Sequence, residues 1–422
     1  MAKVVIVSVG YWGDVMPFIP IADELVTRGH EVVLAVPEGF HEVLAGNRFD
    51  LVHLGTHFSP RELQQHGDLF GRARTIAGMR AGADRCLYPL LIQPAREIAV
   101  VLTDLDADLF VSHRITSFLA QLASEPAGIP LVIGELFPMG VPSIEQPMPL
   151  LPLPRLPGLQ HLTNRAGWAV WRRIVARMFD DDINALRAER GLPQRSPDSL
   201  SWEQACDQIL LLCSEHYWPR CSDWPDHLVH TGFTVWGDPN AALPTGLDAY
   251  LDAGDPPVLI TLGTSAATNA HDAFHLAAEA TEVLGLRSLL LVGSERNLNT
   301  LHGRADVWTF APLPAVLPRC QAVVHAAGHG TVAAALTAGT PQVVMPQITD
   351  QVAHGARLTA LGVGAVVPWK HRSVDRIAAA LSHVLGDPVV TANTRKMAML
   401  LAGEQGPRTA ADAIEKVLAA AG

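Results

Sequence analysis

The sequence predicts an α/β protein built from two parallel sheets, each covered by helices on both faces. Short apolar runs alternate with amphipathic helical segments in residues 1–218, and the same alternation recurs in residues 244–422. Between them, residues 219–243 are dense in Pro, Gly and Trp, which is typical of a linker on the surface. A chain of 422 residues is long enough to bury two full cores.

In the first half, residues 3–10 form an apolar run that predicts a buried strand. An amphipathic helix follows at residues 17–29, where Gly29 ends it, and residues 30–37 predict the second strand. Two further strands are expected at 108–113 and 130–136. These elements form consecutive Rossmann-like units.

The second half repeats the pattern with shorter strands. We expect helices in residues 273–285 and 330–339 between them. The predicted strands are 256–265, 288–294, 307–313, 322–328 and 341–347.

Composition excludes several classes of function. A net charge of −11, with 42 acidic and 31 basic residues, argues against sequence-independent nucleic-acid binding, which needs a clustered basic surface. Five cysteines without a CxxC spacing argue against a zinc knuckle or a disulfide framework. With no signal-like segment and no spanning apolar run, we expect a cytoplasmic protein.

Residues 323–351 contain the strongest candidate binding site. A strand ending at His325 runs through Gly328, Gly330 and Thr331 into a helix, so that backbone N–H groups and the positive helix end point the same way. That geometry suits a phosphate, to which the His325 ring could donate an N–H group. An ordinary glycine turn is the alternative.

Asp14 lies directly after the first predicted strand. It could cap the following helix, because Pro17 is tolerated in a first turn. It could also act as a general base, because loops at the carboxyl ends of parallel strands line the ligand crevice. The sequence around Asp14 alone leaves both roles open.

Residues 307–364 resemble the donor-binding signature of the family 1 inverting glycosyltransferases with the GT-B fold, in particular the bacterial natural-product and lipid-glycosylating enzymes. Two further matches, GDVMP at 13–17 and WPDHLVHTG at 224–232, extend the resemblance over nearly the whole chain. The signature residues are His325, Gly328, Gly330, Thr331, Pro346, Asp350 and Gln351.

The resemblance implies two facing Rossmann-like domains with a cleft between them. Residues 1–218 would bind the acceptor and residues 244–422 the nucleotide sugar, with 219–243 as the linker and the last helix able to pack back on the first domain. The nucleotide sugar, a UDP or dTDP sugar, would be a co-substrate. No cofactor would be required, and the protein would be a monomer or a homodimer.

The resemblance also assigns the donor site. Thr264 and Ser265 would help to hold the diphosphate, and Phe310 and Ala311 would contact the nucleobase, with a core ring as the alternative for Phe310. Asp350 and Gln351 would bind sugar hydroxyls, and a helix N-cap is a compatible role for Asp350.

Two positions depart from the family pattern. Ala327 replaces a common glycine and narrows the loop slightly. His329 is an extra imidazole, either solvated, packed on a neighbour or in contact with the donor.

The resemblance implies that Asp14 is the base; most plant relatives carry His at this position, assisted by an Asp from a later strand. Here the later position is His113, so the pair is exchanged and would act as a dyad in which either residue takes the proton. A satisfied surface histidine is the alternative for His113.

No metal is expected. The acidic run Asp180–Asp182 lies in a segment that predicts a helix with a solvated acidic face. The helix end and His325 would instead stabilise the leaving diphosphate.

The acceptor is expected to be hydrophobic: a polyketide, a macrolide, a glycopeptide-type aglycone or a lipid. The Pro-rich residues 136–160 and the next helix could roof an acceptor site, touch a membrane surface, or pack on their own domain. That helix carries basic residues beside apolar ones. The basic residues are Arg165, Arg172, Arg173 and Arg177, and the apolar residues are Trp168, Trp171, Ile174 and Met178.

Three other functions were weighed against glycosyl transfer. A nicotinamide-dependent oxidoreductase would need GxGxxG after the first strand, where only Gly10 and Gly13 occur. A sugar-nucleotide epimerase shares the two-domain architecture, but its acidic and histidine constellation is not evident. A non-catalytic accessory protein is disfavoured, because the site residues are retained together.

Overall fold

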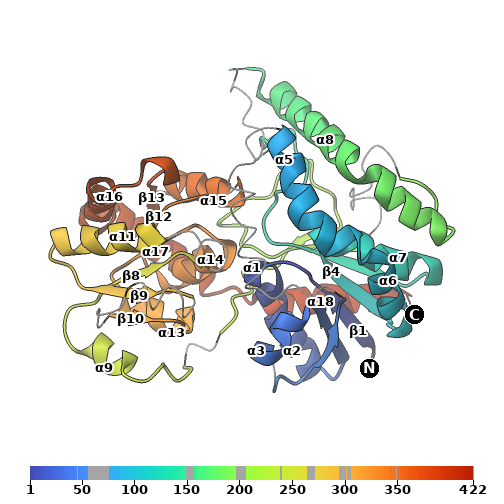
Figure 1. The fold of residues 1–422 in the computed structure, drawn as a ribbon, viewed down its shortest axis with the longest axis horizontal. Helices are drawn as coiled ribbons and strands as arrows, with labels where there is room; N and C mark the ends of the chain where they lie inside the picture. The colour runs from blue at the N-terminus through green and yellow to red at the C-terminus, as the bar shows by residue number, and fades with distance from the viewer. Residues whose placement is uncertain are drawn as a thin grey trace. The chain divides into compact units, whose positions relative to one another are not determined.

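The computed structural model resolves two compact units (Figure 1). Unit 1 comprises Met1–Thr234 and Gln405–Gly422, and unit 2 comprises Val235–Glu404. The structure describes residues 1–421 apart from 45, 56–75, 149–155, 157, 196–205, 238–239, 264–270, 294–300, 302–305 and 348.

Unit 1 is built on a seven-stranded sheet in the order β3-β2-β1-β4-β5-β6-β7. All its neighbouring strands are parallel, which confirms the predicted fold class. Their bounds are β1 Lys3–Val7, β2 Glu31–Val36, β3 Asp50–His53, β4 Leu109–His113, β5 Leu131–Glu135, β6 Gln208–Leu211 and β7 Leu228–His230.

The helix predicted at residues 17–29 is divided in the structure, and helical turns begin before it. α1 at Trp12–Val15 precedes a 3-10 turn at Met16–Phe18, and α2 starts at Ile19. Pro17 and Pro20 each lie in the first turn of their segment, where proline is tolerated. The helical segments of unit 1 are α1 Trp12–Val15, η1 Met16–Phe18, α2 Ile19–Thr27, η2 Glu38–Phe40, α3 His41–Leu44, α5 Ile76–Gly82, η3 Ala83–Ile92, α6 Ala95–Asp104, η4 Arg114–Thr116, α7 Ser117–Ala127, α8 Gln160–Glu189 and α18 Gly406–Ala421.

The segment 219–243, predicted as a linker, contains an element that sequence analysis missed. Leu228–His230 forms β7, the edge strand beside β6, and belongs to unit 1. Its three residues stand among prolines and tryptophans, so their periodicity is too short to indicate a strand.

Unit 2 is built on a six-stranded parallel sheet in the order β10-β9-β8-β11-β12-β13. The strands are β8 Val258–Thr261, β9 Ser288–Leu291, β10 Val307–Trp308, β11 Ala322–His325, β12 Gln342–Val344 and β13 Gly364–Val366. The helical segments are α9 Leu247–Asp252, α11 His271–Val283, α13 Leu313–Val316, η5 Leu317–Arg319, α14 His329–Ala338, α15 Thr349–Ala360, η6 Trp369–His371, α16 Val374–Gly386 and α17 Pro388–Leu401.

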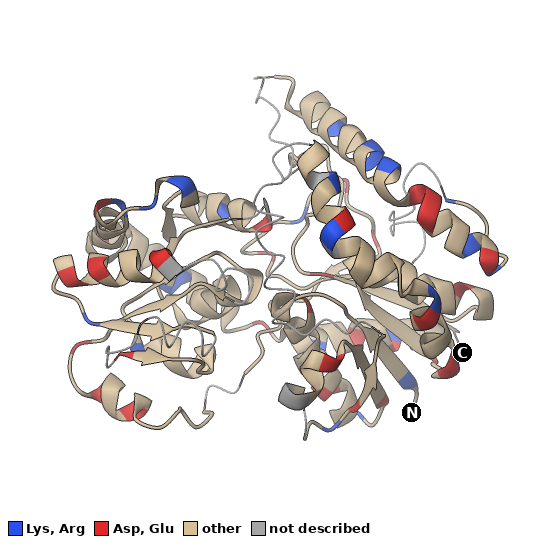
Figure 2. Ribbon diagram, viewed as in Figure 1, with Lys and Arg blue, Asp and Glu red and all other residues tan. Residues whose placement is uncertain are grey.

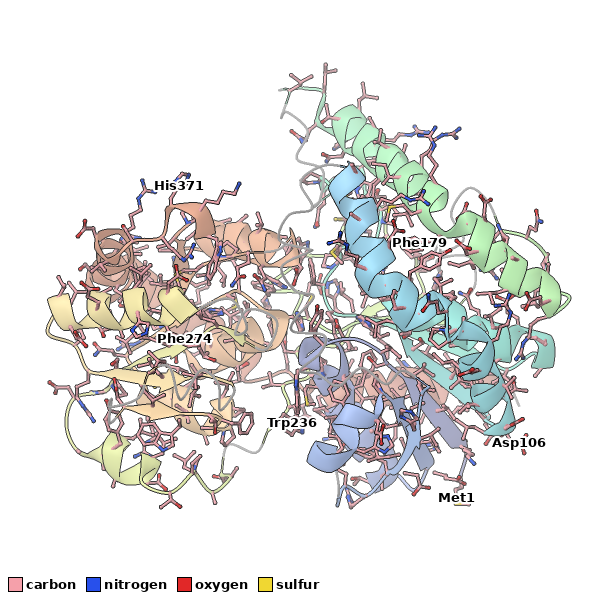
Figure 3. The ribbon with its side chains drawn as sticks, viewed as in Figure 1. Met1, Asp106, Phe179, Trp236, Phe274 and His371 are labelled. Atoms are coloured by element: carbon pink, nitrogen blue, oxygen red, sulfur yellow. The ribbon has the colours of Figure 1, made fainter. Side chains whose placement is uncertain are left out.

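The sheet of unit 2 is buried on both faces. In β8, Val258 and Ile260 join one apolar cluster, whereas Leu259 between them joins another. Phe274 of α11, labelled in Figure 3, belongs to the first cluster and is 1% exposed. The strands therefore read as continuous apolar runs, as a doubly covered parallel sheet requires.

After α17 the chain returns to unit 1, where α18 packs on α2. Arg28, just after α2, pairs with Glu24 of its own helix and with Asp412 and Glu415 of α18. His30 also lies 3.1 Å from Glu415. This ion-pair network fixes α18 against the first βαβ unit.

Gly406 begins α18 where no side chain fits. A Cβ atom there would lie 2.3 Å from the carbonyl oxygen of Phe233, and a backbone atom cannot rotate away. We predict that Gly406→Ala lowers the free energy of unfolding of unit 1 by about 1–3 kcal/mol, as overpacking does. Denaturant titration of the purified protein measures this.

The matched control is Gly403→Ala, where the nearest atom to a Cβ is Leu400 O at 3.9 Å, and it should change stability little. Equal stabilities of the two variants would show that α18 is not packed in this way.

Candidate functional site

Unit 1 brings Asp14 and His113 together at the carboxyl end of its sheet. Because β1 and β4 are adjacent parallel strands, the segments that follow them leave the same edge. His113 ends β4, and its Nε2 lies 3.9 Å from Oδ1 of Asp14. This distance exceeds that of a hydrogen bond, so the two groups are close together without a direct hydrogen bond between these atoms.

The two oxygens of Asp14 face different groups. Its Oδ2 accepts the backbone N–H of Tyr11 at 2.7 Å, and Tyr11 is the N-cap of α1. Asp14 is therefore the third residue of this helix and not its N-cap. Oδ2 of Asp14 thus bonds to the start of the helix, while Oδ1 faces His113. A role in holding the helix start and a role as general base are therefore compatible in this residue.

Gly10 makes this arrangement of Asp14 sterically possible. A Cβ atom on Gly10 would lie 2.3 Å from Asp14 Oδ2, and its φ of +152° is one that side-chain-bearing residues rarely adopt. In the sequence, Gly10 was considered only as part of an incomplete GxGxxG dinucleotide-binding motif. The need for a residue without a side chain at this position becomes visible only in the packed structure.

His113 is a buried histidine, 4% exposed, so the surface alternative was wrong. The ring of Phe18 meets the imidazole edge-on, with centroids 6.0 Å apart. Phe18 fits there because Gly134, opposite His113 in the register of β4 and β5, has no side chain; a Cβ would come 2.5 Å from the Phe18 ring. Packing therefore limits the orientations open to the His113 ring.

A buried ion pair lies on the same edge of the sheet. Glu135 ends β5, is 3% exposed and lies 3.1 Å from Arg114 Nε. Burial raises the pKa of Glu135 to about 7, although Arg114 and the Gly140 N–H lower it. The sequence analysis missed this pair; its signal is a charged residue at the end of an apolar strand.

In unit 2, the ring of His325 is held at both nitrogens. Its Nδ1 accepts the Ala327 N–H at 3.2 Å, so the neutral ring carries its proton on Nε2. Nε2 then donates to Oε1 of Gln342 at 3.0 Å, on the neighbouring strand β12. In this conformation no ring N–H remains for a phosphate oxygen, which differs from the sequence-based expectation.

The charge state of His325 follows from its burial. The side chain is 1% exposed, and desolvation lowers its pKa to about 4, although the bond to Gln342 favours the charged form. The imidazole is therefore neutral at neutral pH, and its two hydrogen bonds link Ala327 of the loop to Gln342 of the neighbouring strand.

Ala327 occupies a backbone conformation that alanine rarely adopts. Its φ is +66°, and among the described non-glycine residues only Asp106 shares a positive φ. A left-handed conformation costs about 1–2 kcal/mol for a residue with a Cβ. The hydrogen bond from Ala327 N–H to His325 helps to hold this turn, which aims the chain into α14.

The amino terminus of α14 lacks a side-chain cap. Its N-cap is Gly328, and no described atom lies within 4 Å of where a Cβ would stand on Gly328 or Gly330. The first-turn amides, which include those of Gly330 and Thr331, have no intrahelical partner in such a helix. Together with the helix dipole they can bind an anion.

His329 packs against a second imidazole that sequence analysis missed. It is 7% exposed and its ring centroid lies 5.6 Å from that of His354 on α15, so of the three roles considered it packs on a neighbour and is not solvated. Burial, and then the nearby His329 and His325, keep the pKa of His354 well below its ordinary value. Three buried histidines, His325, His329 and His354, thus lie near one another at the start of α14.

Asp350 and Gln351 lie in the first turn of α15. Asp350 is the second helical residue, not the N-cap, and burial raises its pKa to about 6 against the effect of two backbone N–H groups. Gln351 is 3% exposed, and its Oε1 accepts the Gln347 N–H at 2.8 Å. Gln351 thus braces the loop before α15.

Phe310 follows β10 and is 58% exposed, so the core-ring alternative was wrong. Ala311 beside it is 2% exposed. Thr264 and Ser265 lie outside the described residues.

Metal ligation has one geometric candidate in the part of the chain that the structure describes. Ligand atoms of Glu145, Cys221 and Asp223 lie within 4.8 Å of one another. The Asp223 carboxylate already accepts hydrogen bonds from Ser143 and Ile144, so it holds two loops together. Asp180–Asp182 lie within α8, as predicted.

Comparisons with known proteins match the chain to proteins named for antibiotic biosynthesis and sugar transfer. Residues 290–417 match the family described as erythromycin biosynthesis protein CIII-like, C-terminal domain. The chain is 28% identical to O-mycaminosyltylonolide 6-deoxyallosyltransferase of Streptomyces fradiae, over 98% of this chain and 97% of the relative. It is also 28% identical to 4'-demethylrebeccamycin synthase of Lentzea aerocolonigenes, over 98% and 99%.

Solved structures share the fold. The calicheamicin glycosyltransferase CalG4 superposes with a TM-score of 0.74 at 18% identity, covering 99% of this chain and 98% of that one. The Streptomyces sp. SF2575 glycosyltransferase SsfS6, complexed with thymidine diphosphate, gives 0.65 at 19% identity, with 99% and 100% covered.

Two parallel-sheet α/β units with these structural neighbours show the GT-B fold. The sequence relatives support a glycosyltransferase that resembles the family 1 enzymes of the bacterial natural-product type.

The buried histidines of unit 2 predict an acid-sensitive fold. The folded pKa of His325, about 4, lies below its ordinary 6.5, so its contribution is complete above pH 6.5 and is lost as the pH falls toward 4. His354 acts in the same direction. Protonation linked to His325 can lower the free energy of unfolding by up to about 1.4 kcal/mol per pH unit in that window.

Asp350 opposes this trend, because its raised pKa makes it stabilising at low pH and less so as pH rises through about 6. The test therefore compares variants: denaturant titrations from neutral pH downward should show a smaller pH slope in His354→Asn than in the wild type. An unchanged slope would contradict the neutral, buried imidazole.

Proposed function

We propose that this glycosyltransferase moves a sugar from a nucleoside-diphosphate donor to a hydroxyl group of a hydrophobic acceptor, with inversion at the anomeric carbon. The observation that carries the proposal is the juxtaposition of Asp14 Oδ1 and His113 Nε2, 3.9 Å apart at the carboxyl end of the unit 1 sheet. A carboxylate beside an imidazole is suited to taking a hydroxyl proton.

The donor diphosphate binds at the start of α14 in this proposal. The uncapped amides from Gly328 to Thr331 supply hydrogen bonds, and the helix dipole favours the negative charge. SsfS6 carries thymidine diphosphate in its solved complex, which supports a UDP or dTDP sugar as the donor here.

Other residues of unit 2 complete the donor site in the proposal. The exposed ring of Phe310 stacks on the base, with Ala311 supplying backbone contacts. Asp350 and Gln351 contact sugar hydroxyls, and Thr264 and Ser265 assist the diphosphate. His325 and Gln342 act from behind the loop by holding Ala327, and His329 lies at the helix start itself.

The proposed transfer breaks the bond between the anomeric carbon and the diphosphate oxygen, and the electron pair leaves with the diphosphate. The acceptor oxygen forms the new bond while its proton passes to the Asp14–His113 pair. The two residues act as a unit in which one takes the proton and the other orients it or stabilises its charge. Charge that develops on the leaving group is stabilised by the α14 amides, without a metal.

The acceptor is proposed to be a hydrophobic natural product or lipid, with the reaction in the cytoplasm. Relatives named for tylonolide and rebeccamycin substrates support this class. In the loop after β5, Leu136, Phe137 and Val141 are at most 9% exposed. These side chains pack within unit 1, so the described part of the loop presents few of its apolar groups to a ligand.

Asp14→Asn separates the two roles of Asp14. The amide oxygen can still accept the Tyr11 N–H, so the variant should fold and bind nucleoside diphosphate normally. Turnover should fall about 10²–10⁴-fold, because the amide cannot share a proton with His113. His113→Ala should lose as much, with no further loss in the double variant.

Asp108→Asn is the matched control. Asp108 also accepts a backbone N–H, that of Lys3 at 2.6 Å, but it precedes β4 and lies at the opposite edge of the sheet. It should retain full turnover. Full turnover in Asp14→Asn would rule out a proton-transfer role for Asp14.

The reaction itself is tested by offering a panel of UDP and dTDP sugars with hydrophobic aglycones and identifying products by mass and anomeric configuration. Transfer with inversion should continue in EDTA, because protein donors neutralise the diphosphate. Metal-dependent turnover would contradict the leaving-group assignment. An epimerised sugar nucleotide, or tight donor binding without transfer, would contradict the proposed reaction.

A further inference from the structure

The amino-terminal half of α8 exposes apolar side chains beside arginines. Leu162 is 63% exposed and Val170 is 51% exposed, and Leu159 just before the helix is 48% exposed. Arg165 and Arg173 are exposed on the same stretch. We call this set, Leu159, Leu162, Arg165, Val170, Arg173 and Arg177, the outer face of α8.

Helical spacing separates the outer face from the side that packs on unit 1. Asn164, Trp168 and Ile174 are buried at intervals of four and six residues, and the Trp168 ring N–H donates to the Gln146 carbonyl oxygen. Phe179, labelled in Figure 3, continues this buried side and is 8% exposed. Leu162, Arg165, Val170, Arg173 and Arg177 recur on the other side, so the exposed leucine and valine are not part of the core.

Charge is distributed unevenly along α8. Residues 146–179 contain no Asp or Glu, although the whole chain has a net charge of −11. Figure 2 shows only basic charges on one half of the helix, whereas both acidic and basic residues occupy the other half, which begins with Asp180. A basic segment on an acidic protein indicates a partner that is itself negatively charged.

The charges of the two halves are also used differently. In the carboxyl-terminal half, Arg187 is buried against Glu125 and Glu189 pairs with Arg96. In the described part of the chain, no ion pair or side-chain hydrogen bond of Arg165, Arg173 or Arg177 is formed. These three guanidinium groups are therefore available to an external partner.

We propose that the outer face of α8 binds the surface of an anionic lipid bilayer, with the helix lying in the plane of the interface. The apolar side chains would enter the boundary between headgroups and acyl chains, and the arginines would contact lipid phosphates. No described helix is long and apolar enough to span a bilayer, so this contact is peripheral. The proposal is independent of the glycosyl-transfer chemistry.

Two other partners fit the same face less well. A second copy related by a twofold axis would place arginines opposite arginines, which repel. A nucleic acid would use the arginines but would leave the exposed Leu162 and Val170 in water. A bilayer of negative headgroups uses both kinds of side chain.

The test is sedimentation of the full chain with vesicles of phosphatidylcholine alone and of phosphatidylcholine with phosphatidylglycerol. The wild type should partition onto the anionic vesicles, less so at high salt, and not onto the neutral ones. Arg165→Glu with Arg173→Glu should reduce partitioning about tenfold or more, because each arginine contributes to attraction by the surface. Leu162→Ser should reduce it with the charge unchanged.

The matched control is Arg395→Glu with Lys396→Glu, the same charge change on exposed residues of α17 in unit 2. It should bind anionic vesicles nearly as the wild type does. Circular dichroism and thermal unfolding verify that each variant is folded.

Absence of wild-type binding to anionic vesicles would overturn the proposal. Equal losses in the α8 and α17 charge variants would do so as well, because binding would then follow net charge alone. If the α8 variants keep vesicle binding but change the oligomeric state, the outer face is an interface between copies and the proposal is wrong.

Discussion

The hydrogen bond from the Ala327 N–H to the His325 ring is the constraint on which the candidate donor site depends. It holds a non-glycine residue at a φ of +66° and fixes the neutral imidazole in one tautomer. Gln342 completes this arrangement from the next strand. The turn then delivers Gly328 to the N-cap of α14, where backbone amides remain available to an anion. Burial of His325 thus keeps its ring neutral, and the neutral ring accepts the hydrogen bond that holds the loop conformation.

In unit 1, the two oxygens of the Asp14 carboxylate likewise have different neighbours. One oxygen accepts the Tyr11 N–H at the start of α1, and the other faces His113. Gly10 permits the first contact by its missing side chain, and Gly134 indirectly supports the second through Phe18. Both candidate sites therefore place a polar group at the end of a parallel strand and position it with backbone features that only small residues allow.

The sequence was sufficient for features that depend on local pattern. Alternating strands and helices predicted two parallel sheets and most of their strands, but not β3, β6, β7 or β13. His325 was found because it ends a strand, and Asp14 because it follows one. Gln342, His354 and Glu135 could not be found this way, because their roles depend on contacts with residues distant in sequence. Gln342 bonds to His325 on the neighbouring strand, and the ring of His354 on α15 contacts that of His329 on α14. The edge strand β7 escaped because three residues carry no measurable period.

We propose that a neutral His325 holds the loop conformation while the start of α14 binds the donor. Nitrogen-15 NMR of the histidine rings, with backbone amide shifts recorded during titration with thymidine diphosphate, tests it most directly. We expect His325 to carry its proton on Nε2 with and without the ligand, and we expect the amide signals of His329, Gly330 and Thr331 to shift on binding. A protonated Nδ1 on His325, or amides of α14 that do not respond, would contradict it.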